Sequence, residues 1–119
     1  FYSRIETLPA LMKVREKYYT MLRDGIKTIE LRLYDEKRQK IKIGELIEFS
    51  CVENPSEKFV VKVKALYRAD DFQHLSTIID IKKAGFFGDT DEMLRIMEEF
   101  YPRENQQKYS VLGIEIQKL

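Results

Sequence analysis

The chain has 119 residues, 44% of them hydrophobic, which is the size and apolar content of one compact domain with its own core. Its 21 lysines and arginines nearly balance its 20 aspartates and glutamates. The resulting net charge of +1 excludes the strong overall positive field of a histone-like or ribosomal-protein-like binder. One cysteine and one histidine exclude an internal disulfide framework, a cysteine-rich zinc module and a multi-histidine metal site.

No stretch of the sequence approaches the roughly 20 consecutive apolar residues that span a bilayer. The first residues also lack the charged-then-apolar layout of a secretory signal. We therefore expect a cytoplasmic protein with no membrane partner, no metal and no organic cofactor.

A single domain is expected over residues 1–119, because no linker, repeat or low-complexity segment divides the chain. Residues 1–11 are expected to form an N-terminal extension, a short helix or turn interrupted by Pro9, that packs on the body. A first strand is predicted over residues 12–15. A helix follows over residues 16–24, with an apolar stripe at helical spacing and a terminating glycine, Gly25.

Residues 26–33 alternate between apolar and polar side chains, which predicts a half-buried strand. Lys27 falls on the apolar side of this alternation at the start of the strand, so its direction stays open. Residues 34–42 form a lysine-rich connection with room for a helical turn. Two further strands, over residues 46–52 and 58–67, flank the turn at Asn54-Pro55 and predict an antiparallel hairpin.

The C-terminal half begins with a short helix that Asp70 or Asp71 can cap, followed by a weakly patterned segment over residues 78–87. The helix over residues 89–101 is the clearest in the chain, because Asp89 and Glu92 have capping-box spacing and Pro102 stops it. Residues 110–119 alternate as a closing strand. Five strands with two or three helices predict an α+β domain built on a small, strongly curved sheet or barrel.

The single histidine and the single cysteine are weak candidates for chemistry. His74 has no nucleophile elbow to serve and is interpreted as a surface or helix-end histidine. Cys51 lies on the apolar side of a strand, so a buried, inert thiol is expected there.

The segment Gly25-x-Lys27-Thr28-x-Glu30-x-Arg32 is the one constellation that could carry chemistry. Glu30 and Arg32 share a strand face, about 6–7 Å apart along the chain. A lysine and an arginine converging on a carboxylate can bind an anion, bind a polar heterocycle, or shift one another's pKa for proton transfer. A solvated strand face with a weak surface ion pair is the alternative.

This segment resembles the signature of the ASCH domain, a member of the PUA-like superfamily. Four later runs resemble that family in the expected order: Lys42 to Phe49, Phe59 to Tyr67, Phe72 to Leu75, and Tyr109 to Ile116. The resemblance covers about residues 12–119. It implies a small PUA-like β-barrel of five to six strands with two or three flanking helices. It also implies a cleft between the Lys27–Arg32 segment and the later helices.

RNA binding is the usual proposal for this family. One small group instead removes the acetyl group of 4-acetylcytidine, and ribonuclease activity is described for another. Compared with the amidohydrolase group, Lys27 matches the lysine, and Glu92, nine residues before Tyr101, matches the glutamate. The threonine nucleophile of that group is replaced here by Glu30, and a carboxylate cannot take its part in amide attack.

Three functions therefore stay open. The first is binding of short or single-stranded RNA, or of a nucleotide or nucleoside, by the ligand-binding candidates Lys27, Thr28, Glu30, Arg32 and Tyr109. Bases would stack on aromatic side chains, and the basic run from Lys37 to Lys42 would help. The stacking candidates are Tyr34, Phe86, Phe87 and Tyr109.

The second is a hydrolase in the same cleft, with Lys27, Glu30 and Glu92 as the catalytic candidates. Lys27 would stabilise negative charge, and Glu30 or Glu92 would move protons. Glu92 has an alternative role as a capping-box glutamate. The third is a protein-interaction or regulatory domain, with an apolar patch such as Phe86-Phe87.

Overall fold

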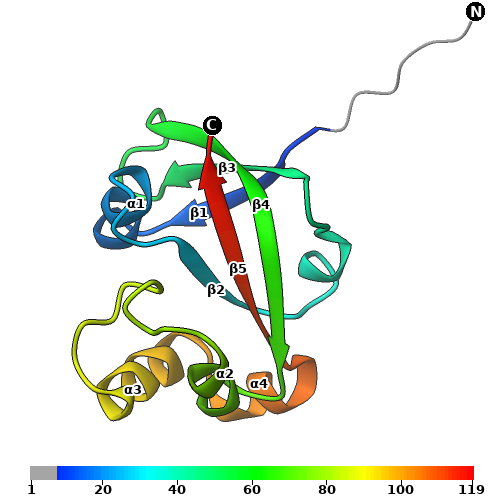
Figure 1. Cartoon of the computed structure of the whole chain (residues 1–119), viewed down its shortest axis with the longest axis vertical. Helices are drawn as coiled ribbons and strands as arrows, with labels where there is room; N and C mark the ends of the chain where they lie inside the picture. The colour runs from blue at the N-terminus through cyan, green and yellow to red at the C-terminus, as the bar shows by residue number, and fades with distance from the viewer. Residues whose placement is uncertain (1–7) are drawn as a thin grey trace, which may run out of the picture.

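The structure is a computed structural model that describes residues 8–119. Within these residues, one curled sheet of five strands is covered by four α-helices and one 3-10 turn (Figure 1). In chain order the elements are β1 (Ala10–Val14), α1 (Glu16–Arg23), β2 (Ile29–Leu33), η1 (Arg38–Lys40), β3 (Leu46–Cys51), β4 (Lys58–Ala69), α2 (Phe72–Ile78), α3 (Thr90–Phe100), α4 (Arg103–Tyr109) and β5 (Val111–Lys118). None of the helices is long and apolar enough to cross a membrane within this part of the chain.

The sheet has the strand order β1-β3-β4-β5-β2, so that β1 and β2 are its two edges. β1 runs parallel to β3, and every other pair is antiparallel. The hairpin expected around Asn54-Pro55 is present, with Phe49 opposite Phe59. The sheet curls into a half-barrel that is open between its two edges. This confirms the α+β class and the small curved sheet that the alternating patterns predict.

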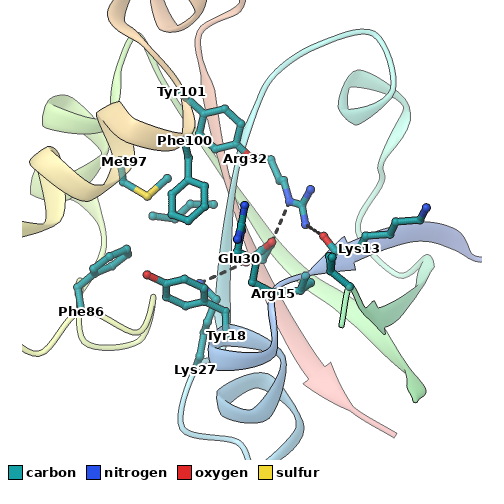
Figure 2. A pocket seen from close by; sticks show the side chains of 13 residues that line it. Lys13, Arg15, Tyr18, Lys27, Glu30, Arg32, Phe86, Met97, Phe100 and Tyr101 are labelled. Carbon is teal, nitrogen blue, oxygen red and sulfur yellow. Dashed lines mark hydrogen bonds and ion pairs between the residues drawn. The ribbon is translucent and has the colours of Figure 1, made fainter. Parts of the chain in front are cut away.

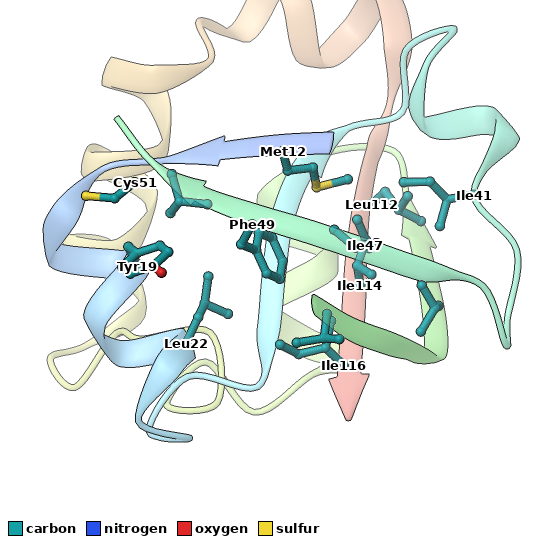
Figure 3. Close-up of a cluster of buried hydrophobic side chains, with 13 residues drawn as sticks. Met12, Tyr19, Leu22, Ile41, Ile47, Phe49, Cys51, Leu112, Ile114 and Ile116 are labelled. Atoms are coloured by element: carbon teal, nitrogen blue, oxygen red, sulfur yellow. The ribbon is translucent and has the colours of Figure 1, made fainter. Parts of the chain in front are cut away.

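The first of two hydrophobic cores fills the concave side of the half-barrel (Figure 3). Period-two alternation points Ile47, Phe49 and Cys51 of β3 inward, and all three are buried. Tyr19 and Leu22 of α1 close one end of this core. Because α1 joins the edge strands β1 and β2, its packing holds both edges of the opening in place.

The second core lies between β2 and the three C-terminal helices, which gather at one end of the sheet (Figure 1). Ile29, Leu31 and Leu33 supply the strand side of this core. The helix side comes from Phe72, Leu75, Met93 and Met97, with Ala84 and Phe86 from the connecting loop. β2 therefore has a fully buried apolar face, and the chemistry of the site is carried by its other face.

Several boundaries differ from those expected. β1 begins at Ala10, so residues 10 and 11 of the expected N-terminal extension belong to a strand, whereas residues 1–7 lie outside the described part of the chain. The strand expected over residues 26–33 begins at Ile29, because the backbone N–H groups of Ile26 and Lys27 complete the end of α1. α4 was not predicted at all. Its sequence, RENQQKY, has no apolar stripe, and its buried residue is a glutamine, Gln106.

Candidate functional site

The end of α1 sets the position of Lys27. Gly25 has a φ of +79°, the left-handed conformation that glycine adopts without steric cost. The backbone N–H groups of Ile26 and Gly25 then donate to the carbonyls of Met21 and Leu22 at 2.9 and 3.3 Å, which is a Schellman ending. Lys27 also donates its backbone N–H to Met21 at 3.1 Å. The chain thus turns sharply and delivers the Lys27 side chain to the interior.

Glu30 is held between two cations on the inner side of β2. Its Oε1 lies 3.2 Å from Lys27 Nζ, and its Oε2 accepts a hydrogen bond from Arg32 Nε at 2.8 Å (Figure 2). Lys27 Nζ also donates to the Ala84 carbonyl at 2.7 Å. Lys27 and Glu30 are only 3% and 6% exposed. The alternative of a solvated surface ion pair is therefore wrong, because the group is buried.

These contacts shift the pKa of each partner. Burial acts to raise the pKa of Glu30, but the positive charges of Arg32 and Lys27 outweigh it and hold the pKa below its ordinary value. Burial lowers the pKa of Lys27, and the neighbouring Glu30 carboxylate opposes that shift. Glu30 is thus a carboxylate at neutral pH, acting as the counter-ion of the group rather than as a proton donor.

Arg32 joins the two edges of the half-barrel. It lies on β2, yet its Nη2 donates to the backbone carbonyl of Lys13 on β1 at 2.8 Å. A cavity of about 240 Å³ opens at this junction (Figure 2). The residues that line it are Lys13, Val14, Arg15, Tyr18, Lys27, Glu30, Leu31, Arg32, Val52, Phe86, Met97, Phe100 and Tyr101. They come from β1, α1, β2, α3 and the connecting loops, so no single stretch of sequence encodes the cavity.

The cavity combines positive charge with aromatic walls. Four of the five charged side chains that line it are cations, although the whole chain carries a net charge of only +1. Arg32 keeps donors beyond the two that it uses, and its side chain is 13% exposed. The walls are Tyr18, Phe86, Phe100 and Tyr101 (Figure 2). Burial is the main cause of the raised pKa of Tyr18 and Tyr101, so both phenols stay protonated.

The structure brings together only part of the predicted site. Lys27, Glu30 and Arg32 converge, whereas Thr28 lies outside the cavity, with its backbone paired to Lys83 and Ile116. Tyr109 packs against the second core and does not line the cavity.

Glu92 is likewise separate from Lys27 and Glu30. Its carboxylate lies against Gly88, and it lines a neighbouring hollow behind Tyr18 and Phe86. Its backbone N–H donates to the Asp89 side chain at 2.9 Å, which confirms Asp89 as the N-cap of α3.

The remaining aromatic and titratable candidates are divided between core and surface. Of the proposed stacking residues, only Phe86 lines the cavity, whereas Phe87 is exposed and Tyr34 carries the guanidinium of Arg68 over its ring at 3.8 Å. Cys51 is buried as expected. Among residues 8–119, no three His, Cys, Asp or Glu side chains gather closely enough to hold a metal ion.

Comparison with known proteins gives the family. The ASCH domain family model matches residues 12–119, which is most of the chain. The chain belongs to the ASCH family. It is also similar to two solved structures: the hypothetical protein PH0355 (31% identity, TM-score 0.83, covering 94% of this chain and all of that one) and protein PF0455 from Pyrococcus furiosus (32% identity, TM-score 0.72, covering 94% and 98%). No curated protein matches significantly.

An ASCH protein from Zymomonas mobilis is 12% identical, with a TM-score of 0.58 over 92% of this chain and 67% of that one, and it supports the fold alone. The PUA-like α+β fold expected for an ASCH domain is therefore confirmed.

Five residues of the cavity were not predicted as site residues: Lys13, Arg15, Tyr18, Phe100 and Tyr101. For the first two a signal existed, because the alternation from Met12 to Arg15 places both cations on one strand face.

Proposed function

We propose that this ASCH domain binds RNA or a nucleotide-like ligand in the cavity between β1 and β2. The observation that carries the proposal is the juxtaposition of the buried Lys27–Glu30–Arg32 group with the aromatic walls of an open cavity. Buried charges in a hollow are more costly than apolar side chains of the same size, so they favour a recognition role over a purely structural one.

The aromatic walls suit a nucleobase. Tyr18, Phe100 and Tyr101 offer faces and edges on which a planar ring can stack, an interaction that tolerates any base. The volume of about 240 Å³ lies below the roughly 300–1,000 Å³ of pockets for larger organic ligands, so one base or nucleoside fits better than an extended segment. Glu30 can accept from a base amino group, since each carboxylate oxygen has two acceptor sites.

The cationic rim suits a phosphate. Lys13 and Arg15 are exposed beside the cavity, and the spare donors of Arg32 face the same space. Arginine forks match phosphate oxygens bidentately, and lysine adds a point charge. A nucleotide with its base inside and its phosphate at the rim would therefore contact both the aromatic walls and the cations of the cavity.

Hydrolysis is less well supported than binding. None of the described residues that line the cavity is a serine, threonine or cysteine, and Glu92 lies in the neighbouring hollow. Glu30 is already paired with two cations, which makes it a weak base.

The test is a titration followed by NMR chemical shifts, with the four ribonucleoside monophosphates, 4-acetylcytidine and RNA tetramers as probes. Mass spectrometry of each mixture reports any product. We expect shifts clustered at residues 13–15 and 27–32, with no product formed.

Two phenylalanines give a matched pair of variants. Phe100→Ala removes a wall of the cavity, whereas Phe87→Ala removes an exposed ring that does not line it. Base stacking on an aromatic ring contributes about 1–3 kcal/mol, so Phe100→Ala should weaken binding by about 5- to 150-fold and Phe87→Ala should leave it unchanged. No shift with any probe would refute the proposal, and a new product would replace it with a hydrolase.

A further inference from the structure

We infer that the ligand is a single-stranded nucleic acid several nucleotides long, and that its backbone leaves the cavity along β1 and continues over the basic 3-10 turn η1. This inference rests on the proposed function, since it takes the cavity as the site of one base. It adds a second contact region, made by Lys37 and Lys40, which lie outside the cavity.

β1 links the two regions. Its alternating burial exposes Leu11 and Lys13 on one face, and Arg15 follows on the same side. Arg15 and Lys13 line the cavity, whereas Ala10 and Met12 line a second hollow of about 410 Å³ further back along the strand. Figure 2 shows the Lys13 side chain extending away from Glu30, out of the cavity. One edge strand therefore has the cavity at one end and the second hollow at the other.

The second hollow is bounded on its far side by cations. Lys37, Arg38 and Lys40 of the η1 region line it together with Ala10 and Met12 of β1, and Glu45 is the one carboxylate among its described lining residues. Lys37 and Lys40 are exposed, and within the described part of the chain neither makes an ion pair. Unpaired cations beside a hollow are suited to phosphates, which supply most of the affinity of nucleic acids for proteins.

The acidic side chains nearby cancel part of this charge but not all of it. Asp35 is paired with Arg38 at 3.1 Å, so the charges of these two side chains offset each other. The Glu45 carboxylate also lines this hollow; it accepts the backbone N–H of Lys42 at 2.8 Å and keeps its negative charge. Glu36 is exposed beside Lys37 and offsets part of its charge. Over residues 35–45 the four cations exceed the three carboxylates by one, an excess that Lys40 and Lys42 supply.

The length of the strand sets the length of the ligand. From Arg15 to Ala10 is five residues, which at about 3.3 Å per residue is about 16 Å. Nucleotides in a stacked strand are spaced about 3.4 Å apart and in an extended strand further, so the path holds about three to five nucleotides. A strand of this length, with one base buried, matches the smaller sites of single-strand binding folds.

The experiment measures the affinity of the full chain for a ribonucleoside monophosphate and for RNA oligomers of two, four, six and eight nucleotides. Lys37→Gln/Lys40→Gln is compared with Lys58→Gln/Lys82→Gln, which removes the same charge from exposed lysines that line neither hollow. We expect affinity to rise up to about four or five nucleotides. In the η1 variant this rise should be lost, whereas binding of the monophosphate is kept.

The salt dependence gives a second readout. Each phosphate contact with a single strand contributes about 0.7 to the slope of log K against log salt, so the η1 variant should lower the slope by about 1.4 for the longer oligomers. Between 50 and 200 mM salt this is about a sevenfold difference. The control variant should keep the wild-type slope. Single-stranded DNA of the same length tests whether the ribose hydroxyl contributes.

Three outcomes would overturn the inference. The first is a monophosphate that binds as tightly as the octamer. The second is an equal loss in the η1 and control variants. The third is an eight-base-pair duplex or a polyglutamate peptide that binds the η1 region more tightly than the single strand does. In contrast, the failure of every nucleotide probe to perturb residues 27–32 would refute the proposed function itself, so the two failures are distinguishable.

Discussion

Replacing Glu30 by glutamine should destabilise the protein strongly. The substitution keeps the shape of the side chain but removes the negative charge that lies 3.2 Å from Lys27 Nζ and 2.8 Å from Arg32 Nε. Lys27 is 3% exposed, so water cannot replace the lost partner. Removing one partner of a buried ion pair costs about 3–5 kcal/mol, because the other charge stays buried without compensation.

The loss can be measured by urea unfolding. A domain of this size has a free energy of unfolding of about 5–15 kcal/mol, so the variant should lose at least about a fifth of its stability. With an m-value of about 2 kcal/mol per molar urea, the midpoint should fall by about 1.5–2.5 M. Glu115 gives a comparison, because its partner Lys64 is 61% exposed and lies 3.7 Å away. Lys64→Met should cost no more than about 1 kcal/mol.

A double substitution separates the charge effect from a loss of packing. Lys27→Met in the Glu30→Gln background removes the buried cation that the first change leaves unpaired, so it should recover part of the lost stability. A Glu30→Gln variant within 1 kcal/mol of the wild type would refute the reasoning. It would mean that the pair is hydrated despite its burial, or that Lys27 is neutral in the folded protein.

Three further predictions follow from the same contacts. The pKa of Glu30 is lower in the folded than in the unfolded chain. Its contribution to the free energy of unfolding is therefore complete above the unfolded pKa of about 4.5 and is lost as pH falls through the folded pKa. The stability difference between wild type and Glu30→Gln, measured from pH 7 to pH 2, should shrink accordingly. Gly25→Ala should cost about 1–2 kcal/mol in urea unfolding, because its φ of +79° is strained for alanine although no atom would contact the new methyl group. Gln106→Leu should cost about 1–3 kcal/mol in thermal or urea unfolding, because the backbone N–H of Phe72 and the carbonyl of Tyr101 lose their side-chain partner.

Local sequence patterns were enough to predict most of the fold. The alternation of residues 46–52 and 58–67 predicted β3, β4 and their hairpin, because a strand with one buried face must alternate. The helix α3 was predicted from its ends. Asp89 caps it as expected, and the helix stops before Pro102. These features depend on neighbours in the chain, so one sequence contains the information needed to predict them.

The missed element shows where local patterns end. α4 has no apolar stripe and is placed by long-range contacts. Gln106 accepts from the backbone of Phe72 at 3.1 Å and donates to the carbonyl of Tyr101 at 2.8 Å, so one buried amide ties the start of α2 to the end of α3. A glutamine in a polar heptapeptide gives no hint of this role. The order of strands, with β1 parallel to β3 at an edge, is equally non-local.

The candidate site, like the fold, was predicted only where it depends on residues that are close in the sequence. Its central segment was predicted, because Glu30 and Arg32 share a strand face and Lys27 follows the glycine that ends a helix. Their burial was not predicted. The polar face of β2 is covered by Tyr18 from α1 and by Phe100 and Tyr101 from around the end of α3. An alternating pattern predicts that one face of a strand is polar, but it does not predict that another element covers that face.

The location of the buried charges is itself an argument for recognition. The two cores consist of hydrophobic side chains, and among the described residues no buried side-chain nitrogen or oxygen lacks a hydrogen-bond partner. The ion group lies instead at the mouth of the half-barrel, where Arg32 reaches from β2 to the Lys13 carbonyl on β1. An apolar side chain could close that gap with less desolvation. The Arg32 guanidinium closes the gap and also presents unused N–H donors to the cavity. A phosphate or a base edge can accept from these donors, which an apolar side chain would not provide.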